Sequence, residues 1–204
     1  MRVRWLPTIV VMLFSLCVVF SFHRVFALAN GEEQKSEVAK VGEKAPEIEL
    51  KSVDGKTVKL SEVLQDEKTK VVVLNFMSIG CPYSQKLEPL VCRLLEERQK
   101  DGLVVLGIVK EFGNPEGVKG YIERMKIKYP LLLDEGLKFF KQVYGAPNTP
   151  TLFIISKQGK LLGKYIGLLG ESDEEYYKFL NEAITAAING KELPPTPEKL
   201  RGKG

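Results

Sequence analysis

Residues 71–84, VVVLNFMSIGCPYS, place a strand, a cysteine and the start of a helix in immediate succession. Val71–Phe76 is a largely apolar run rich in β-branched residues, which is typical of a strand buried on both faces of a sheet. Pro82 suits the first position of a helix, and apolar residues follow at helical spacing as far as Lys100. We therefore expect Cys81 at a helix N-terminus, directly after a buried strand.

Strands and helices alternate in the rest of the chain. Before this stretch, the pattern predicts a hairpin at 47–50 and 57–60 and a short helix capped by Ser61 and ending at Leu64. After it come a strand at 103–109, a helix from Pro115 to about Lys126, a strand at 131–133, a short helix at 135–144, a hairpin at 151–155 and 161–166, and a helix from Ser172 to about Gly190. This order predicts an α/β fold with a central mixed sheet flanked by helices and an N-terminal β-hairpin extension.

The composition fits one domain with a hydrophobic core: 204 residues, 44% hydrophobic and 27% charged. The formal net charge is +4, but residues 1–29 contain three arginines and no acidic residue. Removing them lowers Lys+Arg from 30 to 27 against 26 Asp+Glu, so the remaining chain is nearly neutral. We expect no nucleic-acid partner, because that would require a basic surface.

The first 29 residues have the features of a secretory signal peptide. Arg2 and Arg4 precede an apolar run at 5–22, and the small-residue tripeptide Ala-Leu-Ala follows at 27–29. The alternative is an uncleaved membrane anchor, since about 18 apolar residues just span a bilayer. Either way we expect export to the periplasm or another extracytoplasmic space, with residues 5–22 as the possible tether to the inner membrane.

The exported part divides into three segments. Residues 30–40 are polar and without period, which is typical of a linker. Residues 41–190 carry the predicted strands and helices and form the expected domain, and residues 191–204 are predicted to be a disordered tail.

The single histidine, His23, lies within the first 29 residues. If that segment is removed, the remaining chain has no histidine, and Ser–His–Asp hydrolysis, Cys–His protease chemistry and histidine-ligated zinc or copper sites are excluded. The glycine spacings match neither a dinucleotide fingerprint nor a phosphate loop. We expect no cofactor and no metal, and Cys81 and Cys92 remain as the thiols of the exported chain.

Cys81 is the candidate nucleophile. A thiol at a helix N-terminus faces unpaired backbone N–H groups and the positive end of the helix dipole, and both stabilise a thiolate. Ser84, three residues later, brings a hydroxyl that can donate to the sulfur. The alternative is a structural cysteine that acts as a small hydrophobic residue. Pro150, which opens a predicted strand, is a candidate cis proline, with an ordinary trans turn as the alternative.

Together these features resemble the thioredoxin superfamily, and most closely the exported TlpA/ResA-like thiol–disulfide oxidoreductases of the redoxin type. The resemblance extends from about Val41 to Ile188 and implies a thioredoxin-like fold. Its motifs are Gly42-x-x-Ala45-Pro46, Asp54-Gly55-Lys56, the strand before Cys81-Pro82, Leu132-Leu133-Asp134, Tyr144-Gly145 and Thr149-Pro150-Thr151.

The resemblance implies a role for each matched position. Cys81 matches the first, attacking cysteine of the family's Cys-x-x-Cys motif, and Pro150 matches the cis-proline whose loop faces that sulfur. Ser84 replaces the second, resolving cysteine. The expected catalytic residues are Cys81 and Ser84, and the expected substrate-binding residues are Pro82, Tyr83, Thr149 and Pro150.

Two residues farther along the helix depart from the family pattern. Leu87 stands where ResA-like members often carry a buried glutamate, and the neighbouring Glu88 points about 100° away around the helix, so we do not transfer that role to it. Cys92 would lie about 16 Å from Cys81 on the same helix. Because a disulfide needs Cα atoms within about 7 Å, we expect Cys92 to be structural or partly exposed.

The favoured hypothesis is thiol–disulfide exchange through Cys81 alone, with an external thiol resolving the mixed disulfide and a role in cell redox homeostasis. Its expected partners are exported proteins or small-molecule disulfides and thiols, and an unidentified reducing partner. One alternative is a one-cysteine, peroxiredoxin-like peroxidase, because Ser78-x-x-Cys81 matches half of that family's motif. The other is a non-catalytic binding or assembly module, for example in cytochrome c maturation, because the second cysteine is missing.

Overall fold

The computed structural model describes residues 38–111, 113–167 and 172–197. Contacts divide the chain into two units, residues 1–36 and 37–204, and all described residues belong to the second unit. The predicted signal or anchor segment at 1–29 lies outside the described residues. Within the three described ranges, no helix combines the length and apolar character needed to cross a membrane.

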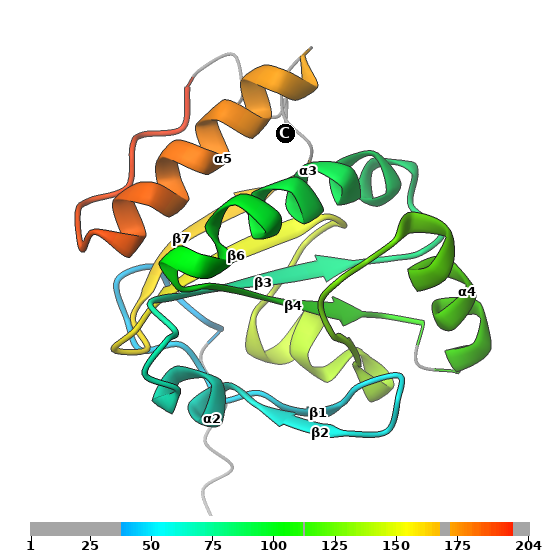
Figure 1. Ribbon diagram of the computed structural model, residues 1–204. Helices are drawn as coiled ribbons and strands as arrows, with labels where there is room; N and C mark the ends of the chain where they lie inside the picture. The colour runs from blue at the N-terminus through cyan, green and yellow to red at the C-terminus, as the bar shows by residue number, and fades with distance from the viewer. Residues whose placement is uncertain (1–37, 112, 168–171, 198–204) are drawn as a thin grey trace, which may run out of the picture. The chain divides into compact units, whose positions relative to one another are not determined.

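A five-stranded sheet forms the centre of the domain (Figure 1). Its strand order is β5 (Leu131–Leu133), β4 (Leu103–Val109), β3 (Val71–Met77), β6 (Thr151–Ser156) and β7 (Leu161–Ile166). The β3, β4 and β5 strands run parallel, whereas β6 is antiparallel to both β3 and β7. The predicted mixed sheet is confirmed, and because β3 and β4 are parallel, their carboxyl ends meet at one edge.

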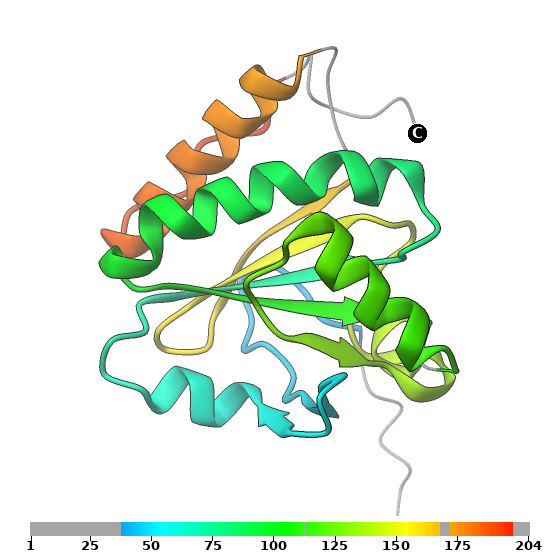
Figure 2. The same ribbon diagram turned by 45° about the vertical axis from the view of Figure 1, so that its right-hand side comes forward.

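The remaining elements cover the two faces of this sheet. Above the strands in Figure 1 lie α3 (Pro82–Arg98), which continues into a 3₁₀ turn at Gln99–Asp101, and α5 (Asp173–Ile188). Buried side chains of α4 (Pro115–Met125) belong to one hydrophobic cluster together with those of α3 and α5. The hairpin of β1 (Glu49–Lys51) and β2 (Thr57–Lys59) lies on the opposite side with α2 (Leu60–Gln65), as Figure 2 also shows.

Alternation along β3 divides the core into two clusters. Val71, Val73 and Met77 pack against α3, α4 and α5, whereas Val72, Leu74 and Phe76 pack against the hairpin side. All seven residues of β3 are buried, as expected for a strand covered on both faces. The same alternation places the polar Asn75 on the α3 side, where its amide reaches Tyr129.

Two predicted helix starts are confirmed at the level of the capping hydrogen bond. The Asn114 side chain accepts from the Gly117 N–H at 3.0 Å, and Pro115 follows as the first residue of α4. The Ser172 hydroxyl accepts from the Glu175 N–H at 3.4 Å at the start of α5. Both caps satisfy a backbone donor that the first helical turn leaves unpaired.

The predicted cap of α2 is wrong. The helix begins at Leu60, so Lys59 holds the capping position and its side chain accepts no capping hydrogen bond. Ser61 lies inside the first turn, and its N–H donates to the Glu47 carboxylate at 3.0 Å. A carboxylate from another segment therefore satisfies the helix end that the serine was expected to cap.

The helix predicted at 135–144 is also wrong, because the segment is broken in two. A 3₁₀ turn at Glu135–Leu137 contains Gly136 at φ 67°, and Leu137 has φ 59°. A π-helical turn follows at Phe139–Val143, and the Asp134 carboxylate accepts from the Phe139 and Phe140 N–H groups at 3.1 and 2.9 Å. Left-handed backbone at two successive residues interrupts the α-helix.

The described ends of the domain are anchored to it. Within the expected linker, the Ala39 N–H donates to the Val143 carbonyl at 2.8 Å. Within the expected tail, Leu193 packs against the larger hydrophobic cluster, close to Gly163. Residues 198–204 of the expected tail lie outside the described residues.

Candidate functional site

A tight turn after β3 presents Cys81 at the start of α3. The Cys81 N–H donates to the Ser78 carbonyl at 3.1 Å, which closes the turn between strand and helix. Cys81 has extended backbone, with φ −86° and ψ 119°, and is the capping residue of α3, and Pro82 follows as the first helical residue. The predicted order of strand, thiol and helix N-terminus is confirmed.

The Cys81 sulfur lies against the loop that precedes β6. Its thiol donates to the Thr149 carbonyl oxygen at 3.2 Å, a contact between residues 68 positions apart in the chain. The Thr149–Pro150 peptide bond is cis. On the other side of that bond, the Pro150 carbonyl accepts from the Gly167 N–H at 2.7 Å, which ties the loop to the end of β7.

Competing effects act on the pKa of the Cys81 thiol. Partial burial raises this pKa, because it disfavours the charged thiolate. Hydrogen bonds from the Thr149 and Ser84 side chains and from the backbone of Ser84 and Tyr83 lower it, and the net pKa lies below the usual value. These groups belong to the helix start and the facing loop, and their net effect is to stabilise the thiolate of Cys81 relative to that of a free cysteine.

Ser84 lies beneath the sulfur in the first turn of α3. Its side chain is buried, at 1% exposure, and its Oγ accepts from the Ser78 N–H at 3.4 Å. A hydroxyl can donate and accept at the same time, and the Ser84 hydroxyl also hydrogen-bonds to the Cys81 sulfur. The serine at the position of the resolving cysteine is thus a donor to the thiol.

The expected substrate-binding residues surround the sulfur with unequal exposure. Pro82 and Tyr83 are exposed, and the Tyr83 ring is the most exposed large hydrophobic side chain among the described residues, at 62%. Thr149 is half-buried and Pro150 is buried. The thiol therefore lies next to an open surface with an aromatic side chain on the helix side.

Cys92 has the opposite electrostatic environment. Among the described residues, Cys81 and Cys92 are both free thiols, as expected from their separation along α3. Cys92 is half-buried, and burial together with the nearby Glu88 carboxylate raises the pKa of its thiol to about 11. Cys92 therefore remains a protonated thiol at neutral pH.

Alkylation by iodoacetamide should distinguish the two thiols. At pH 8 the Cys92 thiol is about three units below its pKa, so roughly one molecule in a thousand carries a thiolate there. We expect Cys81 to be modified across pH 7–8 and Cys92 only above about pH 10, as measured by peptide mass spectrometry. Cys81→Ala and Cys92→Ala identify each site, and equal rates at pH 8 would contradict the prediction.

Sequence reasoning missed the polar cluster around Glu88. This side chain is fully buried in α3, where it accepts a hydrogen bond from the Tyr129 hydroxyl, and Asn75 donates to that hydroxyl at 3.2 Å. Burial raises the pKa of Glu88 to about 7, against the opposing effect of the Tyr129 hydrogen bond. The signal was present in the helix period, since position 88 shares a face with the buried residues 84, 91 and 95.

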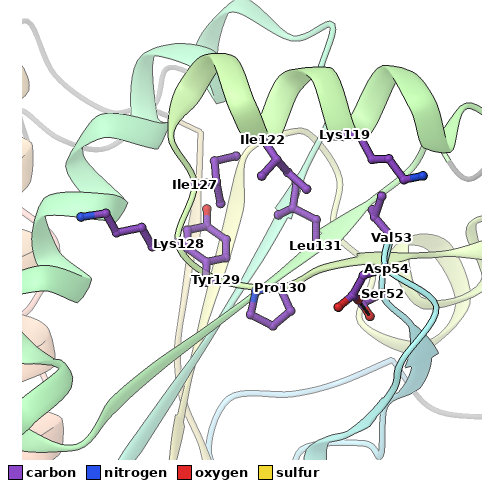
Figure 3. Close-up of a pocket in the computed structure, with 10 residues that line it drawn as sticks. All are labelled: Ser52, Val53, Asp54, Lys119, Ile122, Ile127, Lys128, Tyr129, Pro130 and Leu131. Carbon is purple, nitrogen blue, oxygen red and sulfur yellow. Dashed lines mark hydrogen bonds between the residues drawn. The ribbon is translucent and has the colours of Figure 1, made fainter.

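A groove lies on the far side of this cluster, between α4 and the turn of the first hairpin (Figure 3). Its volume is about 550 Å³, and Tyr129 and Leu131 form part of its wall, opposite Val53. Cys81 is not among its lining residues. Cys81 therefore lies apart from this groove, at the turn that follows β3. In the described part of the chain, no group of three or more acidic, histidine or cysteine side chains is placed to hold a metal ion.

Known proteins with related sequences carry the name of a thiol–disulfide oxidoreductase. The chain is 29% identical over 154 residues to ResA from Bacillus cereus, covering 75% of this chain and 86% of the relative. It is 30% identical over 146 residues to ResA from Geobacillus thermodenitrificans, covering 71% of this chain and 79% of the relative.

Solved structures support the fold. A hypothetical protein from Sinorhizobium meliloti superposes with a TM-score of 0.67 at 20% identity, covering 79% of this chain and 91% of that chain. A putative thiol:disulfide interchange protein DsbE from Chlorobium tepidum superposes with a TM-score of 0.60 at 22% identity, covering 74% and 99%. The predicted thioredoxin-like α/β fold with its N-terminal hairpin is confirmed.

The family model that describes the AhpC/TSA family matches residues 41–163, from before the first hairpin to β7. This range includes the Cys81 turn, the helix that follows it and the Thr149–Pro150 loop. The chain therefore belongs to the AhpC/TSA family, with ResA-like thiol–disulfide oxidoreductases as its homologues.

Proposed function

We propose that the protein catalyses thiol–disulfide exchange through Cys81 as its single nucleophile. The observation that carries this proposal is the position of the Cys81 sulfur at the start of α3, where the Ser84 side chain and the backbone of Ser84 and Tyr83 hydrogen-bond to it, beside an open surface. The relatives' name supports the reaction class. The second thiol of a dithiol mechanism is replaced by the Ser84 hydroxyl, so release of the partner needs a thiol from outside.

The reaction has two balanced steps. The Cys81 thiolate attacks one sulfur of a partner disulfide, forming a mixed disulfide and releasing the other partner sulfur as a thiolate. An external thiolate then attacks the partner sulfur of the mixed disulfide, which restores the Cys81 thiolate and leaves the partner joined to the external thiol. Together the two steps exchange disulfide bonds without net oxidation or reduction. Such a reaction is suited to disulfide exchange or isomerisation.

The partners and the compartment follow from the same chemistry. Disulfides persist in oxidising compartments, and the N-terminal sequence has the features of a signal peptide or membrane anchor. We therefore propose an exported protein that acts on disulfides of exported proteins or small molecules, close to Pro82, Tyr83, Thr149 and Pro150. A separate thiol in that compartment regenerates it.

Trapping of mixed disulfides tests the proposal. The purified protein is incubated with a disulfide-bonded peptide, quenched with acid and analysed on non-reducing gels and by mass spectrometry. We expect a thiol-sensitive adduct at Cys81 that Cys81→Ala abolishes and Cys92→Ala leaves unchanged. Adducts of equal yield in Cys81→Ala would overturn the proposal. Cys81-dependent consumption of hydrogen peroxide without any such adduct would support a peroxidase instead.

A further inference from the structure

The end of β4 brings a carboxylate to the turn that presents Cys81. Glu111 lies two residues after β4, and Ser78 lies one residue after β3. The two strands are parallel neighbours, with Met77 and Val109 in register, so their carboxyl ends lie side by side (Figure 2). Glu111 and Ser78 therefore meet at the edge of the sheet where the thiol is located.

The contact between these residues is direct and sheltered from water. The Ser78 hydroxyl donates to Glu111 Oε1, and Ser78 is 4% exposed. Glu111 Oε2 is also buried, and it has no hydrogen-bond partner among the described residues. Because the Ser78 hydroxyl is the donor in this contact, its hydrogen is directed to Glu111.

Ser78 hydrogen-bonds to two other residues of the turn that presents Cys81, residues 78–84, which we call the thiol turn. Its carbonyl accepts from the Cys81 N–H at 3.1 Å, and its own N–H donates to Ser84 Oγ at 3.4 Å. The Ser78 side chain is held by Glu111, and the Ser78 N–H donates to the Ser84 oxygen. The Ser84 hydroxyl can at the same time donate to the Cys81 sulfur, since a hydroxyl both donates and accepts.

We infer that Glu111 is a positioning residue for the Cys81 nucleophile, acting through Ser78 to hold the turn in which Ser84 donates to the sulfur. This role rests on the proposed function, in which Cys81 attacks a disulfide. Glu111 touches Ser78 and acts on the thiol through it. Sequence reasoning did not identify Glu111, because it follows a different strand and carries no motif of its own.

The other charged groups near the turn do not provide this link. Lys110 donates its backbone N–H to the Met77 carbonyl at 3.4 Å. Glu116, at the start of α4, forms an exposed ion pair with Lys119 at 2.8 Å. Glu88, farther along α3, is hydrogen-bonded to Tyr129. Among the hydrogen bonds of the described residues, that of Glu111 is the one that joins a carboxylate to the thiol turn.

The rate of Cys81 alkylation as a function of pH measures this role without any disulfide substrate. In a Cys92→Ala background, Glu111→Ala and Ser78→Ala should each slow alkylation at pH 7 by about three- to tenfold and raise the midpoint of the pH profile, since one pKa unit corresponds to a factor of ten in thiolate. Glu111→Gln keeps an acceptor oxygen for Ser78 and should retain most of the wild-type rate. Glu116→Ala is the matched control and should not change the rate.

The double variant decides between a shared and a separate effect. If Glu111 acts through Ser78, Ser78→Ala combined with Glu111→Ala is no slower than either single variant. Losses that multiply in the double variant, or a Glu111→Gln rate as slow as that of Glu111→Ala, overturn the inference. Should the alanine variants fail to fold, Glu111→Asp replaces them, because its shorter side chain no longer reaches Ser78. A folded Glu111→Asp with wild-type alkylation would equally overturn it.

This measurement separates the positioning role from the proposed function. Rapid alkylation of the wild-type protein without any mixed disulfides would contradict the proposed function. The pH profile of each variant would then still measure the effect of Glu111 on the Cys81 thiol. Unchanged profiles in every variant, with adducts still formed, would contradict the role of Glu111 alone.

Discussion

Ser84→Cys should release a partner held in a mixed disulfide at Cys81 about a hundredfold faster than the wild-type protein releases it to about 0.01 mM external thiol. The reason is that a thiol within the same molecule acts at an effective concentration of about 1 mM or higher. Ser84 is buried directly beneath the sulfur and already hydrogen-bonds to it. Residues three apart along a helix have Cα atoms about 5 Å from each other, which lies within the range of about 4.4–6.8 Å that a disulfide spans.

The chemistry of the variant also changes from exchange to net reduction. The new thiolate attacks the Cys81 sulfur of the mixed disulfide, the partner leaves as a thiol, and the protein is left with an intramolecular disulfide between positions 81 and 84. Turnover then requires a reductant. Mass spectrometry would show the loss of two hydrogens from the free protein, and non-reducing gels would give the lifetime of the adduct.

A matched control separates proximity from the mere addition of a thiol. Ser61→Cys introduces a cysteine on α2, on the opposite side of the sheet from α3. It should leave the lifetime of the Cys81 adduct unchanged. An adduct that persists equally in Ser84→Cys would show that position 84 cannot reach the sulfur, and would contradict the geometry of the site.

Glu88→Gln should stabilise the protein above neutral pH, with a gain that grows by about 2–3 kcal/mol between pH 5 and pH 8. Burial raises the pKa of Glu88 to about 7 in the folded protein, whereas a glutamate in an unfolded chain loses its proton near pH 4. Between these values the folded state binds more protons than the unfolded state does. The free energy of unfolding therefore falls as the pH rises from about 4 to about 7.

Glutamine removes this dependence because it does not ionise. It keeps an oxygen that can accept from the Tyr129 hydroxyl, so the hydrogen bond of the buried cluster is preserved. Urea unfolding of both proteins at each pH gives the difference directly, and effects of other titrating groups cancel in that difference.

Glu96→Gln provides the comparison on the same helix. Glu96 is an exposed residue that pairs with Lys128, and its replacement should change the free energy of unfolding by at most about 0.5 kcal/mol at any of these pH values. A Glu88→Gln variant with the same pH dependence as the wild-type protein would mean that Glu88 titrates like a solvent-exposed carboxyl.

Local sequence predicted the elements that depend on local interactions. The apolar run of β3 and the helix starts at Pro82, Pro115 and Ser172 all lie where the sequence predicted them. A strand buried on both faces and a capped helix turn are each specified by residues within a few positions of one another. The position of Cys81 between strand and helix was predictable for the same reason.

The elements that were mispredicted depend on contacts from elsewhere. The segment at 135–143 has a helical pattern, yet the Asp134 carboxylate and the left-handed backbone at Gly136 and Leu137 divide it. The start of α2 is paired with Glu47, fourteen residues away, rather than capped by Ser61. Periodicity indicates which residues are buried, but it does not identify the group that lies opposite each of them.

By itself, then, the sequence determined the strand–cysteine–helix unit and the identity of the single thiol at its centre. Only the tertiary structure decided what surrounds that thiol: the Thr149 carbonyl from 68 residues away, and Glu111, which is hydrogen-bonded to Ser78. It also decided that Tyr129 hydrogen-bonds to Glu88 farther along α3. The physical reason is the strand order. Parallel β4 and antiparallel β6 flank β3 on its two sides, and this pairing brings the ends of distant segments to one edge of the sheet.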